Sequence, residues 1–149
     1  MDARGLESDT NYTRGQAARL SDSSVQQLVA WDRADLVTPS GPDGAYTFRD
    51  LVVLRVVHSL LEAGTPRTRV RSALRALAAW GDDLASVRLV ADGRTVWACG
   101  DDGQVLDALK HGQLALFVPV ERIVDEVDAD VRAFTRERAT FVAGLLAEA

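Results

Sequence analysis

Cysteine, histidine and long apolar runs are all scarce in this sequence of 149 residues. The single cysteine, Cys99, excludes an intramolecular disulfide framework and a zinc site built from several cysteines. His58 and His111 have no second ligand at metal-binding spacing, so we expect neither a metal nor a cofactor. No apolar run approaches the ~20 residues of a membrane span, and the polar, acidic start of the chain differs from a signal peptide. We therefore expect a cytoplasmic protein without membrane contact.

Catalytic signatures are missing as well. Asp101 and Asp102 lie in a glycine-containing turn, but the alternating acids and terminal glutamate of a calcium-binding EF-hand loop are absent. The sequence has no Ser/His/Asp ordering pattern, no phosphate-binding glycine loop and no paired glutamate motif. We expect a protein that is not an enzyme.

Apolar residues are plentiful, and charge is spread unevenly along the chain. With 47% hydrophobic residues, the sequence can form a packed core. Residues 13–80 contain nine arginines and six acidic residues, a net charge of +3, whereas residues 83–149 carry a net charge of −5. This asymmetry permits nucleic-acid binding by the first half and protein contacts by the second.

Three capping boxes predict three helices in the first half of the chain. They are Thr13-x-x-Gln16, Ser24-x-x-Gln27 and Thr47-x-x-Asp50, and the third is the weakest because aspartate is shorter than glutamine. The predicted helices span about 14–20, 25–34 and 48–63. A tight turn at 21–23 joins the first two, as in a helix-turn-helix.

Two further features complete the first half. The turn-rich segment 38–44, flanked by Leu36-Val37 and Ala45-Tyr46, predicts a hairpin wing. A fourth helix is predicted at about 66–80, with Arg67, Arg71 and Arg75 on one face. These arginines suit contacts with phosphates; the alternative is a solvated face, or one that pairs with the acidic half of the chain.

The second half predicts a small antiparallel sheet and a long helix. Apolar segments at 87–91 and 95–99 flank the turn Asp92-Gly93-Arg94, another turn follows at 100–103, and a third strand is expected at 114–118. We interpret Cys99 as a small, buried hydrophobic residue of the second strand.

A heptad pattern of apolar residues marks the last helix, about 120–147. One polar residue, Arg138, interrupts the seam. Acidic residues dominate its first part and arginines its last part, so an antiparallel pair would place opposite charges together. We favour a dimer; the alternative is that the seam packs on the chain's own sheet or third helix. The seam consists of Val120, Val124, Val127, Val131, Phe134, Arg138, Phe141 and Leu145.

Residues 12–80 resemble the MerR-type winged helix-turn-helix family. The resemblance rests on the segments Tyr12–Leu20, Ser24–Trp31 and Gly44–Leu51, and on the Leu28, Trp31, Leu36, Pro39 spacing. It implies a DNA-binding transcriptional regulator of bacterial type that dimerises through an antiparallel helix. Three positions depart from the family pattern: Val29 and Ala45 replace arginines, and Asp22 replaces the turn glycine.

We therefore predict an α+β protein with four segments: a flexible N-terminus (1–11), a winged helix-turn-helix of four helices (12–80), a small antiparallel sheet (86–118) and a C-terminal dimerisation helix (119–149). The alternative function is a protein-interaction module or co-regulator that keeps the fold but has lost DNA reading. The expected DNA-binding residues are Arg14, Arg19, Gln26, Gln27, Arg33, Arg49, Arg67, Arg71 and Arg75, with Val29 and Ala30 also facing the groove. The expected dimer interface comprises Val124, Val127, Val131, Phe134, Arg138, Phe141 and Leu145.

Overall fold

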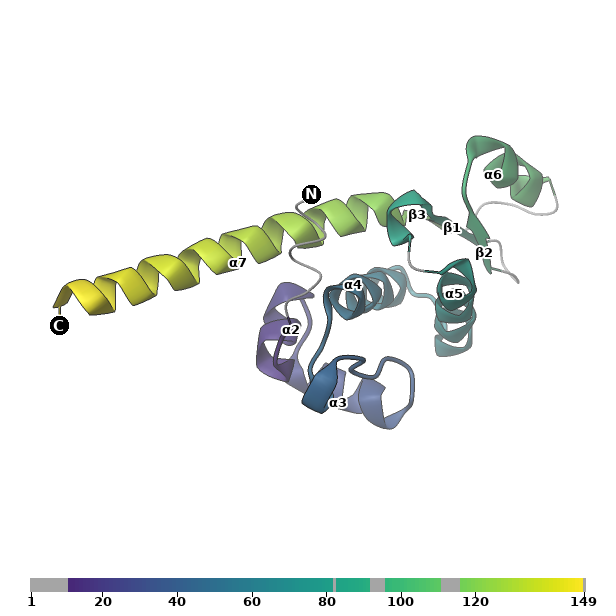
Figure 1. Cartoon of the computed structure of the whole chain (residues 1–149). Helices are drawn as coiled ribbons and strands as arrows, with labels where there is room; N and C mark the ends of the chain where they lie inside the picture. The colour runs from purple at the N-terminus through teal and green to yellow at the C-terminus, as the bar shows by residue number, and fades with distance from the viewer. Residues whose placement is uncertain (1–10, 82, 92–95, 111–115, 149) are drawn as a thin grey trace.

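The computed structural model describes residues 11–81, 83–91, 96–110 and 116–148, and Figure 1 shows how their elements are arranged. The α+β class is confirmed. Residues 1–10 of the expected flexible N-terminus, the Asp92-Gly93-Arg94 turn, His111 and the start of the third predicted strand lie outside the described residues. The helices are α2 (Arg14–Leu20), α3 (Val25–Arg33), α4 (Phe48–Glu62), α5 (Arg67–Trp80), α6 (Asp102–Leu109) and α7 (Val120–Glu148). The strands are β1 (Arg88–Ala91), β2 (Val96–Cys99) and β3 (Leu116–Pro119).

All three predicted capping boxes are formed. The side chains of Thr13, Ser24 and Thr47 each accept a hydrogen bond from the backbone N–H three residues on, and each cap residue donates its own backbone N–H to the side chain at that position. Asp50 also reaches Thr47, whose backbone N–H donates to it at 2.9 Å, although its side chain is the shortest of the three. Asp50 is buried, and its carboxylate also accepts hydrogen bonds from the backbone N–H and the hydroxyl of Ser40. The box that seemed weakest in sequence therefore ties α4 to the loop before it.

The predicted hairpin wing is wrong. In the described range 11–81, Leu36-Val37 and Ala45-Tyr46 form no ladder; Tyr46 instead exchanges two 2.8 Å backbone bonds with Tyr12. The loop closes on itself through a one-turn 3₁₀ helix, η1 (Pro42–Gly44), and a bond from the Gly41 N–H to the Ala45 carbonyl. Pro39 and Pro42 lack the N–H groups that a ladder needs, and Tyr12 takes the backbone groups of Tyr46.

The small sheet has the order β2-β1-β3, with both pairings antiparallel. Side chains alternate between its two faces. Leu89 and Val118 join the main core, whereas Val90 and Cys99 lie on the other face in a small second cluster with Ala108 of α6. The sheet is therefore apolar on both faces, and helices cover both.

Helix α6 is absent from the sequence prediction, which assigned only a turn at 100–103. Asp101 caps this helix: its carboxylate accepts the Gln104 N–H at 2.8 Å, while the Gln104 side chain accepts the Gly100 N–H. The Asp101-x-x-Gln104 spacing is the same as in the three boxes that were recognised. Gly100 and Gly103 favoured a turn in the sequence analysis, although the capping pattern already indicated the start of a helix.

One main core joins the two halves of the chain. Residues of α2, α3, α4 and α5 pack in it together with Leu84, Val87, Leu89, Val118 and the start of α7. In Figure 1, α7 begins beside the sheet, crosses α4 and α2, and projects beyond them at its yellow C-terminal end. This crossing brings the predicted dimer helix against the helix-turn-helix.

Candidate nucleic-acid interface and dimer helix

Both helices of the helix-turn-helix end in the same hydrogen-bonded motif. After α2, the Ser23 N–H bonds to the Ala18 carbonyl, and after α3 the Leu36 N–H bonds to the Trp31 carbonyl, each at 2.9 Å. These are the six-to-one bonds of a Schellman motif, whose next-to-last residue must adopt a left-handed backbone. Asp22 (φ 59°) and Asp35 (φ 54°) occupy those positions. Asp22, which stands where the family has a turn glycine, therefore adopts the left-handed backbone conformation that glycine favours.

Helix α3 presents a mainly exposed face. Leu28 and Trp31 are buried beneath it, while Gln26, Ala30 and Arg33 are exposed and Val29 is half-buried. Arg33 lies in the last turn of the helix. A glutamine amide can bond bidentately to adenine and an arginine to guanine, so this face offers two side chains able to read base edges.

Two other predicted DNA-binding residues are engaged within the protein. The Gln27 side chain accepts the Ser24 N–H at 2.9 Å in the capping box, which uses its carbonyl oxygen. Arg14 pairs with Asp32 at 2.6 Å and donates to the Tyr46 hydroxyl at 3.3 Å. The hydrogen bond to Tyr46 is the main cause that raises the pKa of Arg14. The Gln27 side chain thus caps α3, and Arg14 joins α2 to α3 and to Tyr46.

Arg49 and Arg71 also bond to the protein's own backbone. Arg49 donates to the Gly81 carbonyl at 2.8 Å, just after the end of α5. Arg71 donates to the carbonyls of Ala34 and Asp35 where α3 ends. A guanidinium at a helix C-terminus satisfies carbonyl groups that lack partners and opposes the negative end of the helix dipole. These two arginines position α3 and α5.

Three of the arginines predicted to bind DNA are exposed to solvent. Arg33, Arg67 and Arg75 are exposed, and within the described part of the chain no hydrogen bond or ion pair involves their side chains. Arg67 and Arg75 flank Arg71 at a spacing of four residues, so they share one face of α5. Because Arg71 contacts the end of α3, this arginine face adjoins the exposed helix of the helix-turn-helix.

Arg19 belongs to the contact between the helix-turn-helix and α7. Its guanidinium pairs with Glu137 at 2.7 Å and lies 5.6 Å from the centre of the Phe134 ring. Arg138 lies at the same distance from that ring. Nearby, Arg55 of α4 pairs with Asp130 and donates to the Leu20 carbonyl. These contacts attach α7 to the end of α2.

The heptad seam of α7 divides into two parts. Val120, Val124, Val127 and Val131 are at most 5% exposed because they pack in the core of the same chain. For this part, the structure has the intramolecular packing that was the alternative to a dimer. Every residue from 135 to 148 is exposed. The large apolar side chains on this exposed part are Phe141, Val142, Leu145 and Leu146, and they are 67, 51, 53 and 71% exposed.

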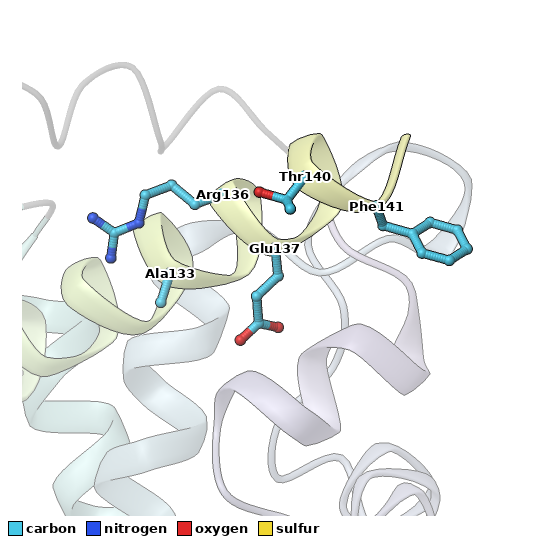
Figure 2. Close-up of a pocket in the computed structure, with 5 residues that line it drawn as sticks. All are labelled: Ala133, Arg136, Glu137, Thr140 and Phe141. Carbon is cyan, nitrogen blue, oxygen red and sulfur yellow. The ribbon is translucent and has the colours of Figure 1, made fainter. Parts of the chain in front are cut away.

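An open groove of about 480 Å³ lies along α7 where it passes the helix-turn-helix. Figure 2 shows Glu137 directed toward the helices below, with Phe141 pointing away toward the C-terminal end. The groove is therefore continuous with the exposed apolar residues. Its lining consists of Ala133, Arg136, Glu137, Thr140 and Phe141.

Cys99 and His58 lie outside this interface. Cys99 is buried in β2, and burial is the main cause that raises the pKa of its thiol. His58 lies between two carboxylates, 3.7 Å from Asp22 and 3.5 Å from Glu62. Over the described ranges, no group of three or more His, Cys, Asp or Glu side chains is arranged to hold a metal ion, and no helix is long and apolar enough to cross a membrane.

Comparison with known proteins agrees with this geometry. Residues 12–77 match the model of the MerR HTH family of regulatory proteins. Uncharacterized HTH-type transcriptional regulators from Mycobacterium bovis and from two strains of Mycobacterium tuberculosis are each 32% identical to this chain over 136 residues. The alignment covers 86% of this chain and 60% of each relative.

Residues 12–77 are thus a MerR-type helix-turn-helix segment, and the resemblance seen in the sequence is confirmed. The chain spans about 60% of the length of these curated relatives.

Sequence reasoning missed the acidic residues that bind the arginines. Asp32, Asp130 and Glu137 each pair with an arginine of the helix-turn-helix or of α4. The two pairs with α7 join residues 75 and 118 positions apart. Only the net negative charge of the second half hinted at these partners.

Proposed function

We propose that this protein is a MerR-like transcriptional regulator that binds DNA as a homodimer. The observation that carries the proposal is the exposed face of α3, with Gln26 and Arg33, inside a MerR-type segment. The relatives are named as transcriptional regulators, which supports the same function. We infer no enzymatic activity, and a cytoplasmic location where bacterial DNA is accessible.

In this proposal α3 enters the major groove. Gln26 and Arg33 contact base edges, while Arg67 and Arg75 on the adjoining face of α5 contact phosphates. Phosphate contacts supply most of the affinity, since few side chains of α3 can form bidentate bonds to bases. We therefore expect binding with a marked salt dependence and modest sequence discrimination.

The dimer would form through the exposed end of α7. A helix of 29 residues is about 44 Å long, and four large apolar side chains on its final turns are left on the surface. Exposed apolar patches of this kind mark interaction sites, and a second copy brings an identical stripe. A two-fold pair would present two copies of α3 to two half-sites. Because the chain's own core covers Val124 and Val127, the two helices would cross nearer Phe141.

Fluorescence polarisation with a labelled duplex of about 30 base pairs, three helical turns, tests DNA binding. Replacing Arg67 and Arg75 together by Ala should flatten the slope of log K against log salt concentration by about 1.8, since each lost phosphate contact removes about 0.9. The matched control replaces Lys110 at the end of α6 and Arg122 of α7 by Ala, the same charge change on other elements. Equal slopes for the two double variants would remove the α5 face from the interface.

The second candidate function is a protein-interaction module that retains the fold without reading DNA. Its specific support is that Arg14, Arg19, Arg49 and Arg71 all bond to the protein's own groups. Half-buried Val29 also stands where the family carries an arginine. A wild-type protein that binds no duplex even at low salt, while remaining folded, would favour this module over the regulator.

A further inference from the structure

We propose that Glu137 of α7 sets the DNA affinity of the helix-turn-helix by competing with phosphate for the guanidinium of Arg19. The inference rests on the proposed DNA-binding function. It assigns a regulatory role to a residue of the helix that is proposed to dimerise, and it makes Arg19 a residue shared between two partners.

The position of Arg19 suits both partners. It lies in the last turn of α2, directly before the Ser21-to-Ser23 turn that leads into the capped start of α3. The Arg19 Nη2–Glu137 Oε2 distance is 2.7 Å, and the two side chains are 64% and 61% exposed. Exposed pairs of this kind are weak and are screened by salt. A phosphate approaching the start of α3 can therefore take the place of Glu137.

The other arginine contacts in this region are built differently. Arg55 is only 18% exposed, pairs with Asp130 and also donates to the Leu20 carbonyl, so it is a fixed anchor between α4, α2 and α7. Arg14 is held by both Asp32 and the Tyr46 hydroxyl. Of these three arginines, Arg19 alone has, within the described part of the chain, a single exposed carboxylate as its polar partner. It is consequently the one whose partner can exchange at low cost.

Phe134 keeps the Arg19 guanidinium in place during such an exchange. The ring centre lies 5.6 Å from the guanidinium carbon, within the range of a cation–π contact. Arg138 approaches the same ring at the same distance. When Glu137 is removed, Arg19 keeps its contact with α7 while its N–H groups become available to a phosphate.

The test compares Glu137→Gln with Glu121→Gln. Glu121 is an exposed glutamate in the first turn of the same helix, well before Glu137, and both variants lose one negative charge. Binding of a labelled mixed-sequence duplex is measured by polarisation over a range of salt concentrations. Because an exposed ion pair is worth at most about a fivefold factor in an equilibrium constant, removing the competing carboxylate should tighten binding by up to about fivefold at low salt, and this gain should shrink as salt screens the pair. We expect this gain for Glu137→Gln and wild-type behaviour for Glu121→Gln.

The double variant Arg19→Ala/Glu137→Gln shows whether Arg19 mediates the effect. It should bind with the affinity of Arg19→Ala, without the gain. The inference is overturned if Glu137→Gln and Glu121→Gln bind alike, or if the double variant retains the gain, and in both cases DNA binding itself still stands. If the wild type and all variants fail to bind the duplex while remaining folded, the proposed function fails, and this inference fails with it.

Discussion

Arg71 of α5 donates hydrogen bonds to the carbonyl oxygens of Ala34 and Asp35, at 2.7 and 3.3 Å, where α3 ends. A residue whose sequence pattern suggested phosphate binding therefore caps the exposed helix of the helix-turn-helix. Its neighbours on the same face, Arg67 and Arg75, are left to solvent. One arginine row thus serves two purposes, positioning α3 and presenting positive charge beside it.

Arg71→Ala should lower the free energy of unfolding by about 1–2 kcal/mol. The variant loses charge-assisted bonds to the carbonyls of half-buried Ala34 and exposed Asp35 at the C-terminus of α3. Arg67→Ala, one turn earlier, should change it by less than about 0.5 kcal/mol because that side chain is exposed. Urea denaturation measures both values. Equal stabilities for the two variants would show that the Arg71 contacts contribute nothing.

Asp35→Gly should raise the free energy of unfolding by about 0.5–1 kcal/mol. Asp35 has a φ of 54° at the end of α3, a left-handed conformation that glycine adopts without steric cost. The complementary variant is Gly64→Ala. Gly64 occupies the same position after α4, with a φ of 82° and open space around it, so alanine there should destabilise through the backbone alone, by about 1 kcal/mol. Shifts of the same sign in thermal denaturation of the two variants would contradict this reasoning.

Phe141→Glu should abolish the proposed homodimer without harming the fold. Phe141 is 67% exposed in the single chain, so a charge there costs nothing within a monomer but would be buried by a partner helix. Ala143→Glu, about 200° around the helix from Phe141, is the control that should remain dimeric. Light scattering and thermal denaturation of both variants check the expectation. A wild-type protein that is monomeric at high micromolar concentration would show that the stripe has another role.

Phe134→Glu is a poorer test of the dimer. Phe134 packs against the main core and lies between Arg19 and Arg138. Its replacement would disturb the attachment of α7 to the helix-turn-helix as well as any partner contact.

The Cys99 thiol should react slowly with a disulfide reagent at neutral pH. Burial raises its pKa, the nearby charge of Asp101 raises it further, and Arg88 opposes them. The reactive thiolate is therefore scarce until the pH exceeds the ordinary cysteine range. The rate should rise steeply as the solution becomes alkaline, and the same reaction in denaturant should be fast. A folded protein that reacts at neutral pH as quickly as the denatured one would mean that Cys99 is accessible.

Much of the fold followed from local patterns. Capping boxes, turn residues and heptad spacing depend on neighbours within a few positions, and they placed α2, α3, α4, α5 and α7 close to their observed ranges. Local composition gave a wrong secondary-structure prediction in two places. The turn-rich segment 38–44 suggested a hairpin, and the glycines around Asp101 concealed α6. In the first case Tyr12 takes the backbone groups of Tyr46, a partner 34 residues away that no local pattern reveals.

The sequence by itself determined the helices of the first half, the strand segments and the long heptad helix, because these depend on short-range periodicity, turns and capping, and the resemblance to the MerR family identified the helix-turn-helix. Tertiary structure alone decided which side chains remain available for function. Burial divided the seam of α7 into a core half and an exposed half. Long-range pairing of Arg19, Arg55 and Arg71 with distant acids and carbonyls decided which cations stay on the surface. An exposed arginine and an internally paired one look identical in a sequence, since the difference lies in what the fold brings within about 3 Å of the guanidinium.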